Sequence, residues 1–258
     1  MDKILNDIRK LIEPQLNAVH ELYHERLGSG IPLVHDINDY LFANHGKELR
    51  VILMLLSAAD KVTDNTIRCA VAMEMLHNAS LMHDDVVDDD DLRRGKPSVK
   101  ARWGNKTAVL CGDYYLANVM LLVNQVDDPH AVEVMHQVVI TMSEGELLQQ
   151  QYIHSDNLNR ELYYDILYRK TASLMAACCE LGDPTMREFG EHFGMAFQIR
   201  DDIADTDEGG LLKPPLQELT EKLRCHIDSA MHILDQRDDS PYLSAIRSLV
   251  GVLNGKEM

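Results

Sequence analysis

The chain has 258 residues, of which 45% are hydrophobic, and a formal net charge of −17. This length allows one large domain with a sizeable core, and the acidic charge argues against binding to nucleic acid or electrostatic attraction to anionic membranes. Five cysteines without CxxC spacing, a start unlike a signal peptide and the lack of a long apolar run predict a cytoplasmic protein without stable membrane insertion. The 14 glycines and 8 prolines mostly punctuate helix-favouring segments, which predicts an all-α fold.

Residues 3–27 carry apolar side chains at helical spacing and are predicted to form one amphipathic helix. Within it, His20, Glu21 and His24 match the HExxH pattern that places two zinc-binding histidines one helical turn apart. No third ligand follows at the usual spacing, and no other feature of the chain requires zinc. We therefore interpret the pattern as a polar helix face.

A short helix is expected over residues 33–44, followed by an apolar helix that ends at Ala59. Lys47 and Arg50 lie in the first turn of the second helix, where basic side chains are unfavourable unless an anion accompanies them. The pair is compatible with a phosphate-sized site at a helix N-terminus. The alternative is two surface cations without a function.

A strongly apolar helix over residues 65–87 delivers Asp84, Asp85 and Asp88, with Asp84 and Asp88 on one face. Carboxylates at a helix C-terminus oppose the helix dipole, so their clustering requires a compensating cation. Mg²⁺ binds through one or two carboxylates together with substrate phosphates. The aspartates therefore predict a metal-phosphate site, and the alternative is a solvated acidic loop.

Two cations, Arg93 and Arg94, follow the first aspartates directly, as expected where a phosphate lies between a metal and a guanidinium. The remaining aspartates, Asp89 to Asp91, are interpreted as solvent-facing and as part of the loop structure. Residues 96–106 are predicted to be a polar loop.

Helices are then expected over residues 107–126, 128–154 and 157–181. The last contains Lys170 and Thr171, which interrupt an apolar face. Taken alone, such a pair is more often a helix edge than a site.

From Pro184 another apolar helix leads to Asp201, Asp202 and Asp205, which repeat the spacing of the first aspartates. One such motif is weak evidence, but two, each ending a buried helix, predict a paired metal site. A linker over residues 209–215 and two last helices bring the expected total to nine to ten helices.

With both aspartate motifs in hand, the chain resembles the trans-isoprenyl diphosphate synthases, the polyprenyl synthetase family, over nearly its full length. The matching pieces, in the order and spacing of the family, are Gly46-Lys47 with Arg50, Glu74 to His77, Leu81 to Asp88, Arg93 to Pro97, Gly112-Asp113, Gly145-Glu146, Lys170-Thr171 and Phe197 to Asp202.

The resemblance implies one isoprenoid-synthase domain over residues 1–258, an all-α bundle around a central cavity, and a homodimer. It implies a prenyltransferase that ionises an allylic diphosphate and lets isopentenyl diphosphate attack the carbocation, giving an all-trans polyprenyl diphosphate. The implied cofactor is Mg²⁺, three ions with substrate bound. Such chemistry needs charge compensation for the leaving group and a dry cavity for the carbocation.

The resemblance also assigns roles to residues of this chain. The metal ligands it implies are Asp84, Asp85, Asp88, Asp201, Asp202 and Asp205. The residues it implies for the isopentenyl diphosphate are Lys47, Arg50, His77 and Arg94. The allylic diphosphate, or the nascent cation, falls to Arg93, Lys170, Thr171 and Gln198. The catalytic set it implies is Asp84, Asp88, Lys170 and Asp201.

The chain departs from the family pattern at three places. Glu48 stands between the two cations of the usual GGKRxRP motif, which predicts weaker binding of isopentenyl diphosphate, and the stretch before Phe197 is shorter than usual. After Asp205 the usual glycine-lysine loop and about two helices are missing. Lys213 is the candidate substitute for the lysine of that loop.

Product length in the family depends on bulk just before the first aspartate motif, where a large side chain closes the cavity. Ala79 and Ser80 are small, so the expected product is geranylgeranyl diphosphate or longer. Two alternatives stay open. One is a catalytically weak or inactive regulatory subunit of a heteromeric synthase. The other is a class I terpene synthase, which the two arginines and the complete second motif disfavour.

Overall fold

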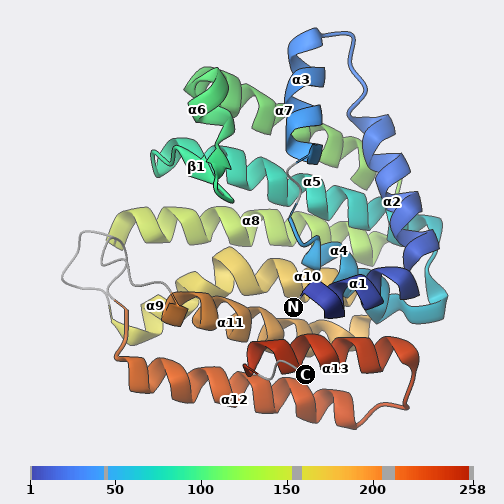
Figure 1. Ribbon diagram of the computed structural model, residues 1–258, viewed down its shortest axis with the longest axis vertical. Helices are drawn as coiled ribbons and strands as arrows, with labels where there is room; N and C mark the ends of the chain where they lie inside the picture. Colours follow the sequence, from blue (N-terminus) through green and yellow to red (C-terminus); the bar gives the residue numbers. More distant parts are fainter. Residues whose placement is uncertain (1, 44–45, 153–158, 205–212, 256–258) are drawn as a thin grey trace.

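The structure, a computed structural model, describes residues 2–43, 46–152, 159–204 and 213–255. Within these ranges almost all regular structure is helical (Figure 1), which confirms the all-α expectation. The α-helices are α1 (Asp2–Leu11), α2 (Glu13–Arg26), α3 (Pro32–Ala43), α4 (Leu49–Ala58), α5 (Asp64–Val87), α6 (Val99–Trp103), α7 (Asn105–Val123), α8 (Pro129–Tyr152), α9 (Arg160–Leu167), α10 (Ser173–Gly182), α11 (Arg187–Ala204), α12 (Leu216–Asp235) and α13 (Pro241–Leu253).

Two expected helices are each divided in the structure, and an expected loop contains a short helix, so the described helices outnumber the nine to ten expected. The single helix expected over residues 3–27 is two helices, because Pro14 lies in the first turn of α2 and cannot continue a helix that precedes it. The helix expected over residues 157–181 is interrupted by a π-helical segment (Tyr168–Ala172) between α9 and α10.

The expected loop over residues 96–106 also has regular structure. Two short antiparallel strands, β1 (Leu92–Arg93) and β2 (Lys96–Pro97), precede α6. The Ser98 hydroxyl caps α6 by accepting a hydrogen bond from the N–H of Ala101 at 3.1 Å. This hairpin fixes the path of the chain directly after the first aspartate motif.

The core lies around α5, α4 and α10, which contribute most of the fully buried side chains. α5 packs against α7, α4 and α2, and its buried length runs from Cys69 to Leu76, so that its last turns emerge at the rim of the bundle. α10 packs against α4, α8 and α11, and α12 covers the outer side of α11, as Figure 1 shows.

Two glycines let α11 approach the neighbouring helix closely. A Cβ on Gly190 would lie 2.6 Å from the Cα of Ala176, and one on Gly194 would lie 2.5 Å from the Cα of Ala172. This close packing brings the end of α11, with the second aspartate motif, beside the π-helical segment that carries Lys170 and Thr171. Among the described residues, no helix combines the length and apolar character needed to cross a membrane.

Candidate active site

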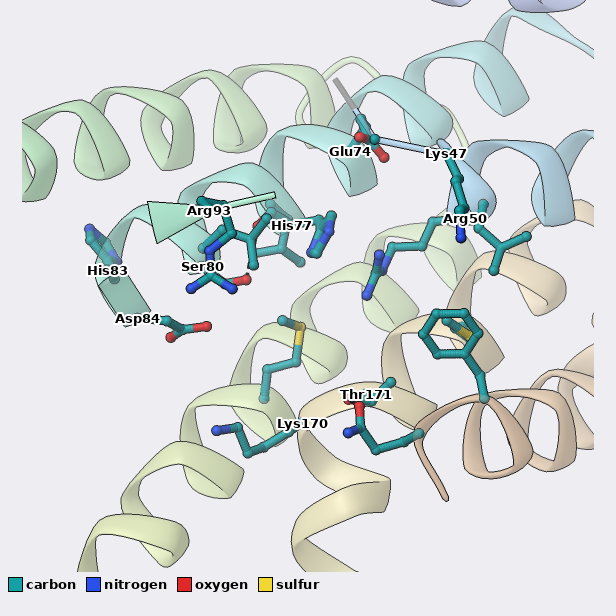
Figure 2. A pocket seen from close by; sticks show the side chains of 18 of the residues that line it. Lys47, Arg50, Glu74, His77, Ser80, His83, Asp84, Arg93, Lys170 and Thr171 are labelled. Carbon is teal, nitrogen blue, oxygen red and sulfur yellow. Dashed lines mark hydrogen bonds between the residues drawn. The ribbon is translucent and has the colours of Figure 1, made fainter. Parts of the chain in front are cut away.

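A cavity of about 1310 Å³ opens between α4, the C-terminal part of α5, α8, the π-helical segment and α11. Figure 2 shows Asp84 and Arg93 on one side of it, Lys170 and Thr171 on the other, and Arg50 reaching in from α4. The sequence-predicted residues that line it are Lys47, Arg50, His77, Asp84, Arg93, Arg94, Lys170, Thr171, Gln198 and Asp201. The structure thus brings together both aspartate motifs and all the proposed cations.

Asp84 is the member of the first aspartate motif that lines the cavity. Burial, with Glu146 and Asp88 adding to it, raises the pKa of Asp84 to about 7 against the opposing effect of Lys170. Lys170 Nζ lies 2.7 Å from Glu146 Oε1 and donates to Gln149 Oε1 at 2.8 Å. At the wall of the cavity, Lys170 therefore pairs with Glu146, and its charge also favours the ionised form of Asp84.

Asp85 points away from the cavity into the protein and is almost fully buried. Its Oδ1 accepts a hydrogen bond from Arg93 Nε at 2.7 Å and a second bond from Arg93 Nη2. Asp88 is the exposed C-cap of α5 and is absent from the cavity lining. The structure therefore gives Asp85 the role of holding Arg93, whereas only Asp84 of this motif faces the cavity directly.

The aspartates that follow the motif stabilise the hairpin. The buried Lys100 amino group lies 2.6 Å from Asp89 Oδ1 and 3.2 Å from Asp91 Oδ1. Asp89 and Arg94 both have positive φ, at 57° and 54°, a conformation that costs energy in residues other than glycine. The interpretation of residues 89–91 as loop structure is confirmed. The strained turn sets the positions of Arg93 and Arg94.

The second aspartate motif divides in the same way. Asp201 lines the cavity, with Arg200 Nη2 donating to its Oδ1 at 3.2 Å. Asp202 does not line it, because its two oxygens accept hydrogen bonds from the Tyr163 hydroxyl and from Gln198 Nε2, the latter at 2.9 Å. Asp205 lies outside the described residues.

A chain of hydrogen bonds connects Asp202 to the cavity wall. Gln198 Oε1 accepts from the Thr171 hydroxyl at 2.9 Å, so Asp202 fixes the orientation of the Gln198 amide and, through it, of Thr171. Lys213, the candidate substitute for the missing loop lysine, donates to the backbone oxygen of Asp202 at 3.2 Å. Its amino group therefore lies next to the second motif.

The other end of the cavity is cationic. Arg50 reaches into it (Figure 2), and its buried Nε has no hydrogen-bond partner among the described residues. The Arg94 guanidinium lies against Gly46, where a Cβ would come within 2.5 Å of Nη2. Burial and the neighbouring arginines hold the pKa of His77 well below its usual range, which keeps this imidazole neutral at pH 7. An orphaned guanidinium N–H among arginines fits an anionic group such as a diphosphate.

Residues shortly before each aspartate motif differ in whether they line the cavity. Ser80 lines the cavity, whereas Ala79 is fully buried and is not part of the cavity lining. On α11 the residue one turn before Asp201 is Phe197, which lines the cavity as well. Of the two small residues before the first aspartate, only Ser80 therefore borders the cavity.

Several lining residues carried no assigned role at the sequence level. Glu146 lies in a matched motif, but only the folded chain shows its pairing with Lys170. Arg9 of α1 lines the cavity although nothing in its local sequence separates it from any other helix-surface cation. The HExxH histidines take different partners: His20 Nε2 lies 2.6 Å from Glu48 Oε1, and the His24 ring stacks on Phe42.

The donor set fits Mg²⁺ bound together with a phosphate ligand. In the described part of the chain no three acidic, histidine or cysteine side chains form a cage that could hold a metal by themselves. Mg²⁺ does not need such a cage, because it binds through one or two carboxylates together with water and phosphate oxygens. Asp84, whose charge is disfavoured by Glu146 and Asp88, has the environment that a divalent cation relieves.

Comparison with known proteins agrees with the geometry. The sequence model described as "Polyprenyl synthetase" matches residues 31–210. The octaprenyl diphosphate synthase of Haemophilus influenzae is 30% identical over 78% of this chain, and heptaprenyl diphosphate synthase component 2 of Bacillus subtilis is 36% identical over 78%. The matches span 65% and 59% of these relatives' own lengths.

The fold has close counterparts among solved structures. The crystal structure of a decaprenyl diphosphate synthase from Rhodobacter capsulatus superposes with a TM-score of 0.85 and 23% identity, covering 96% of this chain and 98% of that one. This likeness establishes the fold, while the family match over residues 31–210 includes all the cavity-lining residues except those of α1. The chain therefore belongs to the polyprenyl synthetase family.

Proposed function

We propose that the protein is a prenyltransferase that condenses isopentenyl diphosphate with an allylic diphosphate to give an all-trans polyprenyl diphosphate. The observation that carries the proposal is a single cavity with an acidic wall, formed by Asp84 and Asp201, and a cationic end that contains Arg50 and Arg94. Such a cavity can hold two diphosphates in different electrostatic surroundings. The names of the relatives support the same reaction class.

The allylic diphosphate is assigned to the acidic wall. Mg²⁺, three ions when substrate is bound, would be held by Asp84 and Asp201 and would neutralise the charge that develops on the leaving diphosphate. Asp85, Asp88, Asp202 and Asp205 stay in the proposed ligand set only through water or after a change of partner. Arg93 and Lys170 supply further positive charge at this wall, since both line the cavity.

The isopentenyl diphosphate is assigned to the cationic end. Lys47, Arg50 and Arg94 would bind its diphosphate, and neutral His77 can donate one hydrogen bond. When the allylic carbon–oxygen bond breaks, the diphosphate leaves with the electron pair. The double bond of isopentenyl diphosphate then forms the new carbon–carbon bond, and loss of one proton restores an allylic product.

The lining between the two ends suits a carbocation. Phe197, Met175 and Met142 exclude water, and the Thr171–Gln198 pair presents oriented dipoles at the cavity wall. Because Ser80 leaves space before the first aspartate motif, we propose a product of geranylgeranyl length or longer. The apolar space continues along Leu116 of α7.

We place this activity in one isoprenoid-synthase domain over residues 1–258 that acts as a homodimer. The support for a dimer is the set of exposed apolar side chains on α7, namely Leu110, Met120 and Leu121. Exposed patches of this kind mark interaction sites in folded proteins. A cytoplasmic location is supported by five free cysteines, four of them buried.

The test is incubation of purified protein with Mg²⁺, labelled isopentenyl diphosphate and a series of allylic diphosphates, with the products identified by mass. We expect incorporation of label into chains of at least four isoprene units, and its loss when Mg²⁺ is chelated. Asp84→Asn is the matched inactive control. No incorporation with any allylic diphosphate would sink the proposal.

A second candidate function is a component of a heteromeric synthase. It is favoured by the name of the Bacillus subtilis relative, which designates that protein as component 2 of its enzyme. A chain that incorporates no isopentenyl diphosphate alone, yet binds it in a direct titration, would support this candidate over the first. Release of a hydrocarbon in the absence of isopentenyl diphosphate would instead indicate a terpene synthase.

A further inference from the structure

A carboxylate lies at the cationic end of the cavity, where a diphosphate is expected to bind. Glu48 stands between Lys47 and Arg50, lines the cavity, and its side chain is only 8% exposed. It has a positive φ of 55° at the start of α4, and its side chain does not cap that helix. A buried anion here weakens the attraction for a diphosphate and is costly unless cations compensate it.

The compensating cations come from the two N-terminal helices. His20 of α2 places Nε2 at 2.6 Å from Glu48 Oε1, and Arg9 of α1 places Nη2 at 3.8 Å from Oε2. Arg9 Nη2 also donates a hydrogen bond to the backbone oxygen of Lys47 at 3.1 Å. Each helix therefore delivers one positive group to the strained turn that carries the diphosphate-binding cations.

His20 is the titratable member of this group. The charged groups that face it are Glu48 before α4, Arg9 of α1 and Glu74 of α5. The hydrogen bond that His20 donates to Glu48 is the largest influence and raises the pKa of His20, with Glu74 acting in the same direction, while burial and Arg9 oppose it. When His20 loses its proton, Glu48 loses a positive charge at 2.6 Å, while Arg9 stays at 3.8 Å.

We propose that Arg9, His20 and Glu48 form a positioning unit that sets the affinity of the cationic end for isopentenyl diphosphate, with protonated His20 favouring binding. The inference rests on the proposed function and names a specificity device within that site. Arg9 and His20 precede residue 31, where the match to the family's sequence model begins, so two of the three residues of the unit lie outside the matched region.

The physical reason is a balance of charge near the diphosphate. With His20 protonated, the Glu48 carboxylate is paired at hydrogen-bond distance and repels the ligand little. With His20 neutral, the site loses this positive charge close to the Glu48 carboxylate, at a buried position where charges are weakly screened. The loss of one charge-assisted hydrogen bond is enough to weaken binding by about tenfold.

The experiment measures the dissociation constant of isopentenyl diphosphate by calorimetry at pH 6 and pH 8, without an allylic partner, for wild type and His20→Gln. The matched control is His24→Gln, which alters the other histidine of the same helix. For each protein we compare the dissociation constant at pH 8 with that at pH 6. We expect this ratio to be larger for wild type and for His24→Gln than for His20→Gln. The ionisation of the ligand is common to all three proteins and cancels.

A second variant separates the charge balance from a simple loss of structure. Glu48→Gln removes the anion, so it should bind more tightly than wild type at pH 8 and lose the part of the pH dependence that depends on His20. Combining it with His20→Gln should restore the affinity that His20→Gln alone loses. A purely structural defect would persist in the double variant.

Two outcomes overturn the inference. One is a pH dependence in His20→Gln equal to that of wild type. The other is a double variant that binds as weakly as His20→Gln alone. Wild-type protein that binds no isopentenyl diphosphate at either pH would overturn the proposed function as well, whereas incorporation of label with a pH-independent affinity would overturn this inference alone.

Discussion

The two aspartate motifs have the same spacing but use their second aspartate differently. In each motif the first aspartate, Asp84 or Asp201, lines the cavity. The second aspartate of the first motif, Asp85, pairs with a cation, Arg93, whereas Asp202 accepts hydrogen bonds from the neutral Tyr163 hydroxyl and the Gln198 amide. Identical local patterns therefore do not imply identical roles.

The difference has a chemical consequence. The Asp85–Arg93 ion pair holds a guanidinium at the cavity, where an anionic ligand can compete for it. Asp202 instead belongs to a fixed network that orients Gln198 and Thr171. One motif adjusts the charge at the site and the other sets the direction of its dipoles.

The largest effect is expected where the motifs are alike. Asp84→Asn and Asp201→Asn should each lower kcat/KM by about a thousandfold, because each removes a cavity-facing carboxylate that would hold the proposed metal. Steady-state assays check this, with circular dichroism and thermal unfolding as controls for the fold. If the Asp201→Asn variant kept most of its activity, the first aspartates of the two motifs would not have equivalent roles.

The second positions should separate the motifs. Asp85→Asn removes the buried charged partner of Arg93 and leaves the exposed Asp90 at 3.4 Å, and we expect kcat/KM to fall by about a hundredfold. Asp202→Asn keeps one oxygen that can accept from Gln198 Nε2, and its amide N–H can donate to the Tyr163 hydroxyl, so we expect a loss of about tenfold. Equal losses in the two variants, measured in parallel under the same conditions, would contradict the distinction drawn between charged and neutral partners.

The residues one turn earlier should change the product more than the rate. Ser80→Phe places an aromatic ring in the cavity and is expected to shorten the product by at least one isoprene unit. Ala79→Phe should not shorten it but should destabilise the fold by about 3 kcal/mol, because that side chain is packed inside the core. Product masses and urea unfolding distinguish the two, and a shortened product from a stable Ala79→Phe enzyme would contradict the assignment.

The smallest effect concerns the stability of metal-free protein. Because the pKa of Asp84 is raised to about 7, its charged form is disfavoured in the folded state. This destabilisation is absent at pH values below the unfolded pKa, grows as pH rises, and is complete above about pH 7. Asp84→Asn should therefore gain stability over wild type, and the gain should be greater at pH 8 than at pH 5.

The measurement is urea unfolding in the presence of a chelator at several pH values. Asp228→Asn on the exposed surface of α12 is a matched control that should follow wild type at every pH. A difference between Asp84→Asn and wild type that stays constant from pH 5 to pH 8 would show that the carboxyl of Asp84 does not titrate in this range.

Much of the fold was predictable because it depends on local patterns. Helical spacing of apolar residues located α5, α7, α8 and α11, and each of them is present close to its expected bounds. The break at Ile12 follows from Pro14 and is a local feature, whereas the π-helical segment was less predictable because it depends on how neighbouring helices pack. The short α6 lies within a predicted loop, because five residues are too few to show the apolar periodicity of a helix.

By itself, the sequence determined the helical class, the two acidic motifs and the cations Lys47, Arg50, Arg93 and Arg94, because residue type and spacing along one helix are local properties. Only the tertiary structure decided which aspartate of each motif faces the cavity, and that Ser80 rather than Ala79 borders it. It alone joined Arg9 and His20 to Glu48. These features depend on the rotation and contacts of helices distant in sequence, which no local pattern records.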